Sequence, residues 1–207
     1  MRRCVIVGGA PIARPEELRA YLRGDDFLIC CDGGLRHAAA LGRQPDLIVG
    51  DFDSCEDPHA AIETIVLPRA KDDTDSCFAA KEALRRGFRD FLLLGAVGAR
   101  LDHTLGNLAV ALMLAGAGAK VRLADDFSEM ELVSDEAAVT DAFAYFSLLP
   151  LGGAAEGVSV TGAKFPLSGA VLGPESSLGV SNEVLPGETA RIRVEKGTLL
   201  LVRVRRG

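Results

Sequence analysis

The sequence contains no tryptophan, and aromatic residues make up only 5% of its 207 residues. It also lacks any uncharged apolar run near the roughly 18 residues that indicate a membrane-spanning helix. Basic residues are outnumbered, 23 against 29 acidic ones, which gives a net charge of −6. Such a chain is a poor partner for nucleic-acid phosphates or anionic lipid surfaces. We therefore expect a soluble, cytoplasmic protein that binds neither nucleic acid nor membrane.

Two common phosphate-binding motifs are missing, the P-loop GxxxxGK[ST] and the dinucleotide-binding GxGxxG. Any bound phosphates must then be held by a metal ion, by lysine and arginine side chains, or by helix N-termini. Gly8-Gly9 indicates only a tight turn. The five cysteines are odd in number and form no CxxC pair, which favours buried thiols over a zinc site or disulfides.

Apolar runs alternate with helix-like segments in the first part of the chain. We expect strands at 4–7, 27–31, 47–49, 64–67, 91–94 and 120–123, and helices at 15–23, 35–41, 75–86 and 103–115. This alternation is typical of a parallel sheet covered on both faces. The sequence therefore predicts a Rossmann-like α/β domain over residues 1–130.

The pattern changes after about Ser134, where long helix-like runs disappear. Short strands are expected at 145–149, 157–161, 170–172, 191–194 and 199–204. Glycine and proline separate them at short intervals, which is typical of an all-β sandwich or barrel. The segments 191–194 and 202–205 resemble a closing hairpin around Lys196-Gly197. We expect the boundary between 125 and 142, and a β-sandwich over 131–207.

Charged residues follow four of the expected strands. Asp32 follows the second, Asp51 and Asp53 the third, 71–75 the fourth and 100–103 the fifth. Because ligands of open parallel sheets bind beyond the carboxyl ends of the strands, these loops are expected to converge on one site.

The segment PDLIVGDFDS (45–54) places Asp51 and Asp53 two residues apart, just after an apolar strand. Mg²⁺ binds one or two protein carboxylates and completes its coordination with water and substrate phosphates. A surface turn would account for this sequence equally well, since Asp and Ser are favoured in turns. From this segment alone the two interpretations are about equally favoured.

Two further segments carry charges at helix starts. In KDDTD (71–75), helix capping explains Thr74 and Asp75 but leaves Lys71, Asp72 and Asp73 unexplained. In RLDH (100–103), Arg100 suits a polyphosphate because its planar guanidinium can pair with two oxygens. Asp102 either contributes to the site or caps the helix, and on helical spacing His103 and Asn107 share one face.

Together these segments resemble the thiamine pyrophosphokinase family. The matching segments, which occur in the family's order and cover both halves of the chain, are DGG (32–34), PDLIVGDFDS (45–54), KDDTD (71–75), GAVGARLDHTLGN (95–107), FSLLPL (146–151), GVSVTGAKFPL (157–167) and GVSNE (179–183). The resemblance implies an α/β domain, a β-sandwich and a homodimer. It also implies Mg²⁺-dependent transfer of pyrophosphate from ATP to thiamine, which gives thiamine diphosphate and AMP.

The resemblance also implies roles for individual residues. Asp51, Asp53 and Asp75 resemble the catalytic magnesium and polyphosphate cluster. The substrate contacts it implies are Asp32, Gly33, Asp46, Lys71, Asp73, Thr74, Arg100, Asp102, His103 and Asn107, with Ser181 and Asn182 at the thiamine end, reaching the other subunit's site. Some family members stack thiamine on a tryptophan, which this chain lacks, so the ring that covers thiamine stays open.

Two other functions fit parts of the same pattern. One is a related pyrophosphokinase acting on a pterin alcohol, against which the C-terminal match down to GVSNE counts. The other is a nucleotide sensor without turnover, against which the many carboxylates count. The four apolar residues 199–202, expected to face both sides of one strand, favour a homodimer through the second domain.

Overall fold

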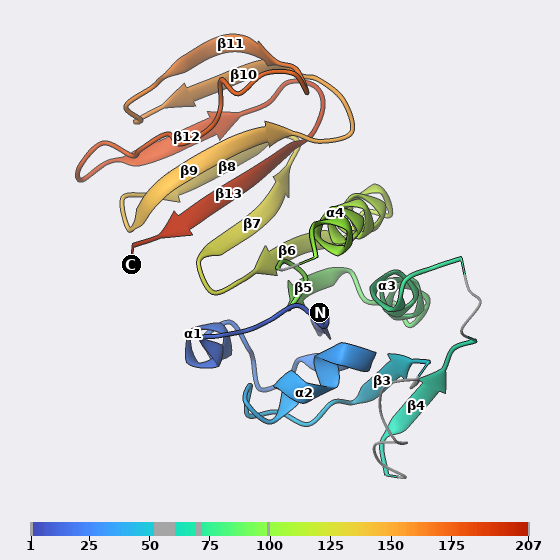
Figure 1. Cartoon of the computed structure of the whole chain (residues 1–207). Coiled ribbons are helices and arrows are strands. Elements are labelled where there is room, and N and C mark those ends of the chain that lie inside the picture. Colours follow the sequence, from blue (N-terminus) through green and yellow to red (C-terminus); the bar gives the residue numbers. More distant parts are fainter. Residues whose placement is uncertain (1, 52–60, 69–71, 99, 207) are drawn as a thin grey trace. The chain divides into compact units, whose positions relative to one another are not determined.

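The computed structural model describes residues 2–51, 61–68, 72–98 and 100–206. The chain divides into two compact units, Met1–Asp126 and Phe127–Gly207. Figure 1 colours them along the sequence, from blue at the N-terminus to red at the C-terminus. Among the described residues, no helix is both long and apolar enough to cross a membrane.

The first unit contains a parallel sheet with strands in the order β4-β3-β2-β1-β5-β6. Its elements are β1 (Cys4–Val7), α1 (Pro15–Arg19), β2 (Phe27–Cys31), the short 3₁₀-helix η1 (Asp32–Gly34), α2 (Leu35–Ala38), β3 (Leu47–Gly50), β4 (Glu63–Val66), α3 (Asp75–Arg85), β5 (Asp90–Leu94), α4 (Leu101–Gly116) and β6 (Lys120–Ala124). The parallel sheet predicted from the apolar runs is confirmed.

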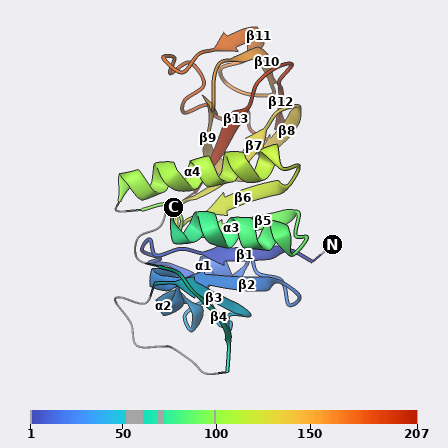
Figure 2. The same cartoon turned by 90° about the vertical axis from the view of Figure 1, so that its right-hand side faces the viewer.

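Helices pack on both faces of this sheet. Leu18 of α1 and Ala38 of α2 join a buried apolar cluster with side chains of β1, β2 and β5. Figure 1 shows α3 and α4 together on the other side of these strands, and Figure 2 shows them in front of β1, β5 and β6. The central strand β1 is buried along its whole length, as expected for a strand covered on both faces.

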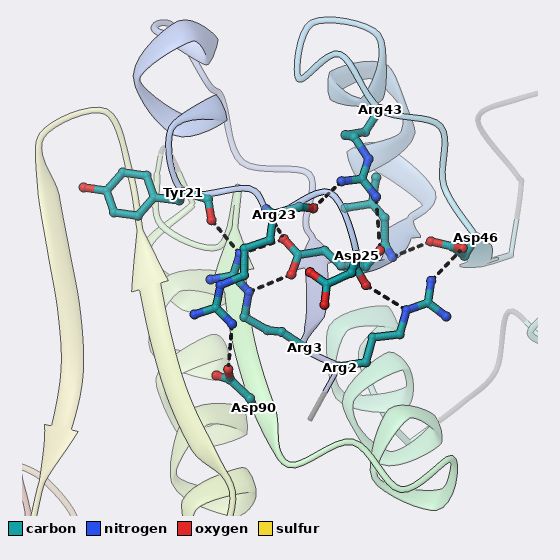
Figure 3. A network of polar contacts seen from close by, with 10 residues as sticks. Arg2, Arg3, Tyr21, Arg23, Asp25, Arg43, Asp46 and Asp90 are labelled. Atoms are coloured by element: carbon teal, nitrogen blue, oxygen red, sulfur yellow. Dashed lines mark hydrogen bonds and ion pairs between the residues drawn. The ribbon is translucent and has the colours of Figure 1, made fainter.

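Helix α1 is shorter than the sequence predicts, because tertiary contacts end it early. The guanidinium of Arg3 donates to the carbonyl of Tyr21 at 2.5 Å, and the carboxylate of Asp26 accepts from the backbone N–H of Arg23 at 2.7 Å. These bonds hold residues 20–26 in turns rather than in further helix. Figure 3 shows Arg3 beside Tyr21 and Arg23 in this polar network.

The second unit consists of antiparallel strands. They are β7 (Ser128–Val133), β8 (Glu136–Thr140), β9 (Phe143–Pro150), β10 (Ala155–Thr161), β11 (Leu167–Leu172), β12 (Thr189–Arg193) and β13 (Leu199–Arg205). Strands β7-β13-β9 pair with one another, and β11-β10-β12-β8 form a separate sheet. Buried side chains from both sets, among them Phe146, Val160 and Leu201, form one apolar cluster.

The closing hairpin predicted from 191–194 and 202–205 is wrong. Strand β12 pairs with β8 and β10, whereas β13 pairs with β7 and β9. The connection between them bonds to other segments, since Val194 N–H donates to Asp135 and Lys196 N–H donates to Glu156. Strands β7 and β8 were also missed by the sequence interpretation.

The run 199–202 does not need a partner chain to explain its apolar residues. Leu199, Leu200 and Leu201 are at most 4% exposed within the single chain, and two of them belong to the second unit's core. The sequence argument that derived a homodimer from this run therefore loses its basis.

Candidate active site

A cavity of about 410 Å³ lies at the carboxyl edge of the first unit's sheet. Its walls come from the loops after β1, β2 and β5 and from the first turns of α3 and α4. The lining residues are Gly9, Ala10, Pro11, Cys31, Gly33, Arg36, Thr74, Asp75, Ser76, Gly95, Ala96, Arg100, His103, Thr104 and Asn107. Six of the residues predicted from the sequence thus line one cavity: Gly33, Thr74, Asp75, Arg100, His103 and Asn107.

Glycines let the three loops pack backbone against backbone beneath this cavity. A Cβ atom on Gly8 would lie 2.6 Å from the carbonyl oxygen of Gly95, and one on Gly9 would lie 3.3 Å from the Cα of Gly33. Gly95 also has a φ of +57°, a conformation that favours glycine. Gly8-Gly9 is therefore more than the tight turn that the sequence indicates, because it brings the loop after β1 to the cavity.

Thr74 and Asp75 form the start of α3 as the capping pattern predicts. The Thr74 hydroxyl accepts a hydrogen bond from Cys77 N–H at 3.2 Å, and Asp75 is the first helical residue. Burial, followed by the negative charge of Asp75, raises the pKa of the Cys31 thiol. The charge of Asp75 therefore acts at the end of β2, on the cavity side.

Asp73, two residues before α3, is held by a lysine that the sequence interpretation did not single out. Lys81 Nζ lies 2.9 and 2.6 Å from the two Asp73 carboxylate oxygens, and the Cys77 thiol donates to the same carboxylate at 3.4 Å. The hydrogen bond from Lys81 is the main cause that lowers the pKa of Asp73. Asp73 is not among the residues that line the described cavity.

The end of β3 packs against Asp32, the residue that follows β2. A Cβ atom on Gly50, the last residue of β3, would be only 2.7 Å from the Cβ of Asp32. Asp51 follows Gly50 directly. Asp32 and Asp51 therefore both lie at the carboxyl ends of adjacent parallel strands, β2 and β3. Asp53 and Lys71 lie outside the described residues. Within the described ranges, no three His, Cys, Asp or Glu side chains cluster as metal ligands.

The structure corrects the role of Asp102 as a helix cap. Helix α4 begins at Leu101, its N-cap is Arg100, and no side chain caps it. Asp102 instead forms an ion pair with Arg100 at 2.6 Å, with the two side chains 66% and 70% exposed. The N-cap residue Arg100 has no side-chain acceptor to offer the helix. Its guanidinium pairs instead with the carboxylate of Asp102, two residues further on.

Two side chains of α4 fix the loop that follows β5. The Asn107 amide nitrogen donates to the carbonyl of Ala96 at 2.8 Å, and Gly98 N–H donates to the Thr104 hydroxyl at 3.2 Å. Asn107 is buried. It therefore shapes the cavity wall that it also lines.

Asp46 is not brought together with the other predicted residues. It precedes β3 and so lies at the amino end of the sheet, opposite the cavity. Its carboxylate accepts from Leu28 N–H at 2.8 Å and pairs with Arg2 at 3.3 Å, as Figure 3 shows for Arg2 and Asp46. These contacts connect β3 to β2 and to the chain before β1.

The two residues predicted for the thiamine end lie in the second unit. Ser181 is exposed and has a φ of +60°, which makes it the only non-glycine residue with positive φ in the described chain. Strained backbone of this kind often marks functional sites. Asn182 is buried, and its side chain bonds to the backbone of Phe165, whose ring is 55% exposed. The sequence interpretation did not single out Phe165.

Comparisons with known proteins cover both units. Residues 18–123 match the family model described as "Thiamin pyrophosphokinase, catalytic domain", and 132–199 match "Thiamin pyrophosphokinase, vitamin B1 binding domain". The thiamine pyrophosphokinase of Bacillus subtilis is 26% identical over 212 residues, which cover 98% of this chain and 99% of that protein. A crystal structure of thiamine pyrophosphokinase from B. subtilis has a TM-score of 0.86 at 25% identity and covers 99% of both chains. One from Geobacillus thermodenitrificans has a TM-score of 0.84 at 26% identity and covers 99% of this chain and 98% of that one.

Proposed function

We propose that this chain, which belongs to the thiamin pyrophosphokinase family, transfers the pyrophosphate group of ATP to the hydroxyl of thiamine. The products are thiamine diphosphate and AMP. The observation that carries the proposal is that the catalytic and the vitamin B1 binding models follow one another along this chain, over 18–123 and 132–199. The cavity at the carboxyl edge of the sheet supports it, since open parallel sheets bind ligands there.

In the proposed reaction, the thiamine hydroxyl oxygen forms a bond to the β-phosphorus of ATP. The bond between that phosphorus and the oxygen bridging to the α-phosphate breaks, and AMP leaves with the bridging oxygen. Such transfers depend mainly on alignment and charge neutralisation. Asp75, which lines the cavity, is our candidate to orient the hydroxyl and accept its proton. When ATP binds, its phosphate oxygens replace the carboxylate of Asp102 as partners of the Arg100 guanidinium.

The donors at this edge fit Mg²⁺. They are hard carboxylate oxygens, and Mg²⁺ needs only one or two of them beside substrate phosphates and water. We propose Asp51 and Asp75 as the described ligands, with Asp53 as the third predicted member. When bound, Mg²⁺ neutralises negative charge on the polyphosphate.

Phe165 is our candidate for the ring that covers thiamine. Its exposed side chain follows Lys164 and lies in the same part of the second unit as Ser181 and Asn182, through the Asn182 hydrogen bonds. The thiazolium ring of thiamine is positively charged, and an aromatic face attracts a cation by roughly 0.5–2 kcal/mol. Phe165 can therefore cover the thiazolium ring in a chain that contains no tryptophan.

The finer organisation is also a proposal. We infer that 1–130 is a Rossmann-like ATP-binding catalytic domain, and that 131–207 is a β-sandwich for thiamine binding and dimerisation. A homodimer would cover the exposed apolar side chains Leu178, Val180 and Leu185 of the second unit. In this dimer Ser181 and Asn182 reach the site of the other subunit. The cytoplasmic location stays a prediction of the sequence.

One assay separates this function from the alternatives. The protein is incubated with ATP, Mg²⁺ and either thiamine or a pterin alcohol, and AMP is quantified. We expect AMP to form when thiamine is the acceptor and not when the pterin alcohol is. Formation of AMP with the pterin alcohol only would favour the related pyrophosphokinase, and binding of ATP without any AMP would favour a nucleotide sensor.

A further inference from the structure

Two arginines line the described wall of the cavity, and they differ in their charge partners. Arg100 is paired with the carboxylate of Asp102 at 2.6 Å. Arg36 belongs to α2, directly after the Asp32–Gly34 turn, and forms no ion pair with any carboxylate in the described ranges. Among the described residues, Arg36 is therefore the arginine of this wall whose guanidinium is not engaged in an ion pair.

Neutral groups nevertheless hold the Arg36 side chain in place. Its Nη2 donates to the carbonyl oxygen of Gly9, in the loop after β1, and its Nε lies 3.4 Å from the Nε2 atom of His37. The guanidinium thus bridges the loops that follow β1 and β2, both of which form the cavity wall. The energy needed to order a long side chain is spent before any ligand arrives.

His37 supports this arrangement without adding charge. The ring is 9% exposed, and its Nε2 lies 2.9 Å from the carbonyl oxygen of Ala10. Burial lowers the pKa of His37 below its ordinary value, and the positive charge of Arg36 acts in the same direction. This shift favours the neutral imidazole, so the permanent positive charge beside the loop after β1 is that of Arg36.

We propose that Arg36 binds the β- and γ-phosphates of ATP, an inference that rests on the proposed function. A guanidinium pairs two phosphate oxygens at once and retains its charge at any physiological pH. Most of the negative charge of ATP lies on these two phosphates, so a guanidinium at the cavity wall that forms no ion pair within the described ranges stabilises them most. Neither P-loop nor GxGxxG is present to hold them instead.

The test measures binding rather than turnover. Isothermal titration calorimetry, with Mg²⁺ present, compares pyrophosphate, ATP and AMP on the full-length protein and on Arg36→Met. We expect pyrophosphate and ATP to bind roughly tenfold to hundredfold more weakly to the variant, as for loss of a charge-assisted hydrogen bond, and AMP to bind within about twofold of the original. Arg36→Lys should restore part of the loss.

Arg19→Met is the matched control, because Arg19 also donates to a backbone carbonyl, that of Ala40 at 2.7 Å, but does not line the cavity. It should leave all three affinities unchanged. Unaltered pyrophosphate and ATP binding in Arg36→Met, or an equal loss for AMP, would overturn the inference. So would weaker binding accompanied by a lower thermal midpoint that Arg36→Lys does not restore. If the wild-type protein formed no AMP from thiamine and ATP, the proposed function would fail, yet the pyrophosphate comparison would still decide the role of Arg36.

Discussion

The side chain of Asn182 holds the backbone of Phe165 at two points. Its amide nitrogen donates to the Phe165 carbonyl at 2.7 Å, and its amide oxygen accepts from Phe165 N–H at 3.0 Å. The backbone of Asn182 pairs in addition with that of Phe146. One buried residue therefore connects a core strand, an exposed aromatic ring and the strained Ser181 next to it in sequence.

Asn182→Ala should lower the free energy of unfolding by about 1–3 kcal/mol, because it leaves the N–H and carbonyl of Phe165 without partners. Urea denaturation measures the change. Glu183→Gln is the control, since it removes only the half-exposed ion pair with Lys164 and should cost less than about 1 kcal/mol. Equal stability losses in the two variants would contradict the structural role of Asn182.

Phe165→Ala should raise the KM for thiamine by roughly 3- to 30-fold, the range expected for losing a cation–π contact. The KM for ATP should stay the same. Phe165→Trp should retain thiamine affinity, and Phe127→Ala, which truncates another exposed phenylalanine, should change neither constant. Steady-state kinetics with each substrate varied in turn decide the matter. An unchanged KM for thiamine in Phe165→Ala would remove Phe165 from the site.

Asp26 and Arg3 form a buried ion pair at 2.6 Å, with both side chains at most 2% exposed. Burial would raise the pKa of Asp26, but hydrogen bonds from Arg3 and from Arg23 N–H, and the charge of Arg3, hold it below its usual range. A depressed carboxyl pKa adds stability above the unfolded-state value of about 3.9, and this stability is lost as the pH falls through the folded-state pKa.

Asp26→Asn should therefore cost about 3–5 kcal/mol near neutral pH, because Arg3 is left buried without a charge partner. The difference from wild type should shrink as denaturation is repeated at pH values below about 4. Asp90→Asn, which breaks a more exposed pair with Arg23, serves as control. A difference that stays constant with pH would show that Asp26 is not ionised in the native state.

Asp51→Asn should abolish turnover and leave the unfolding free energy nearly unchanged, since removing charge from a metal site affects catalysis more than stability. Asp46→Asn should instead retain turnover and lower the unfolding free energy. Asp46 binds Leu28 N–H and Arg2 at the far end of the same strand, so its loss should lower stability and leave the KM for ATP intact. Near-normal rates in Asp51→Asn at ordinary Mg²⁺ concentrations would refute the magnesium assignment.

The sequence was sufficient to predict the parallel sheet and the edge of the sheet at which the cavity lies. Strands such as Leu47–Gly50 are buried on both faces and consist of continuous apolar runs, and Thr74 was recognised from capping preferences alone. The rule that ligands meet the carboxyl ends of strands also argues against Asp46, since Asp46 precedes its strand. The resemblance placed it in the site, whereas its position before β3 places it at the opposite edge.

Other features depended on contacts between segments far apart in the chain. Strand β7 carries serine and glutamates at half-exposed positions, and β8 carries Glu136 and Thr140 at exposed ones, so a search for apolar runs misses both strands. Strands β12 and β13 pair with different neighbours, and the backbone of the segment between them bonds to Asp135 and Glu156. Arg36 lies in none of the matched segments, and Phe165 lies in one of them, 157–167, but its sequence context does not distinguish it from a buried core phenylalanine.

The central claim is that the bond to the β-phosphorus of ATP is broken and that thiamine receives two phosphates. We propose incubating the protein with thiamine, Mg²⁺ and ATP that carries separate labels on its β- and γ-phosphates. The account predicts that both labels appear on thiamine in equal amounts, with one AMP formed for each product. Transfer of the γ-label alone, with ADP accumulating, would contradict it, as would release of AMP that does not depend on thiamine.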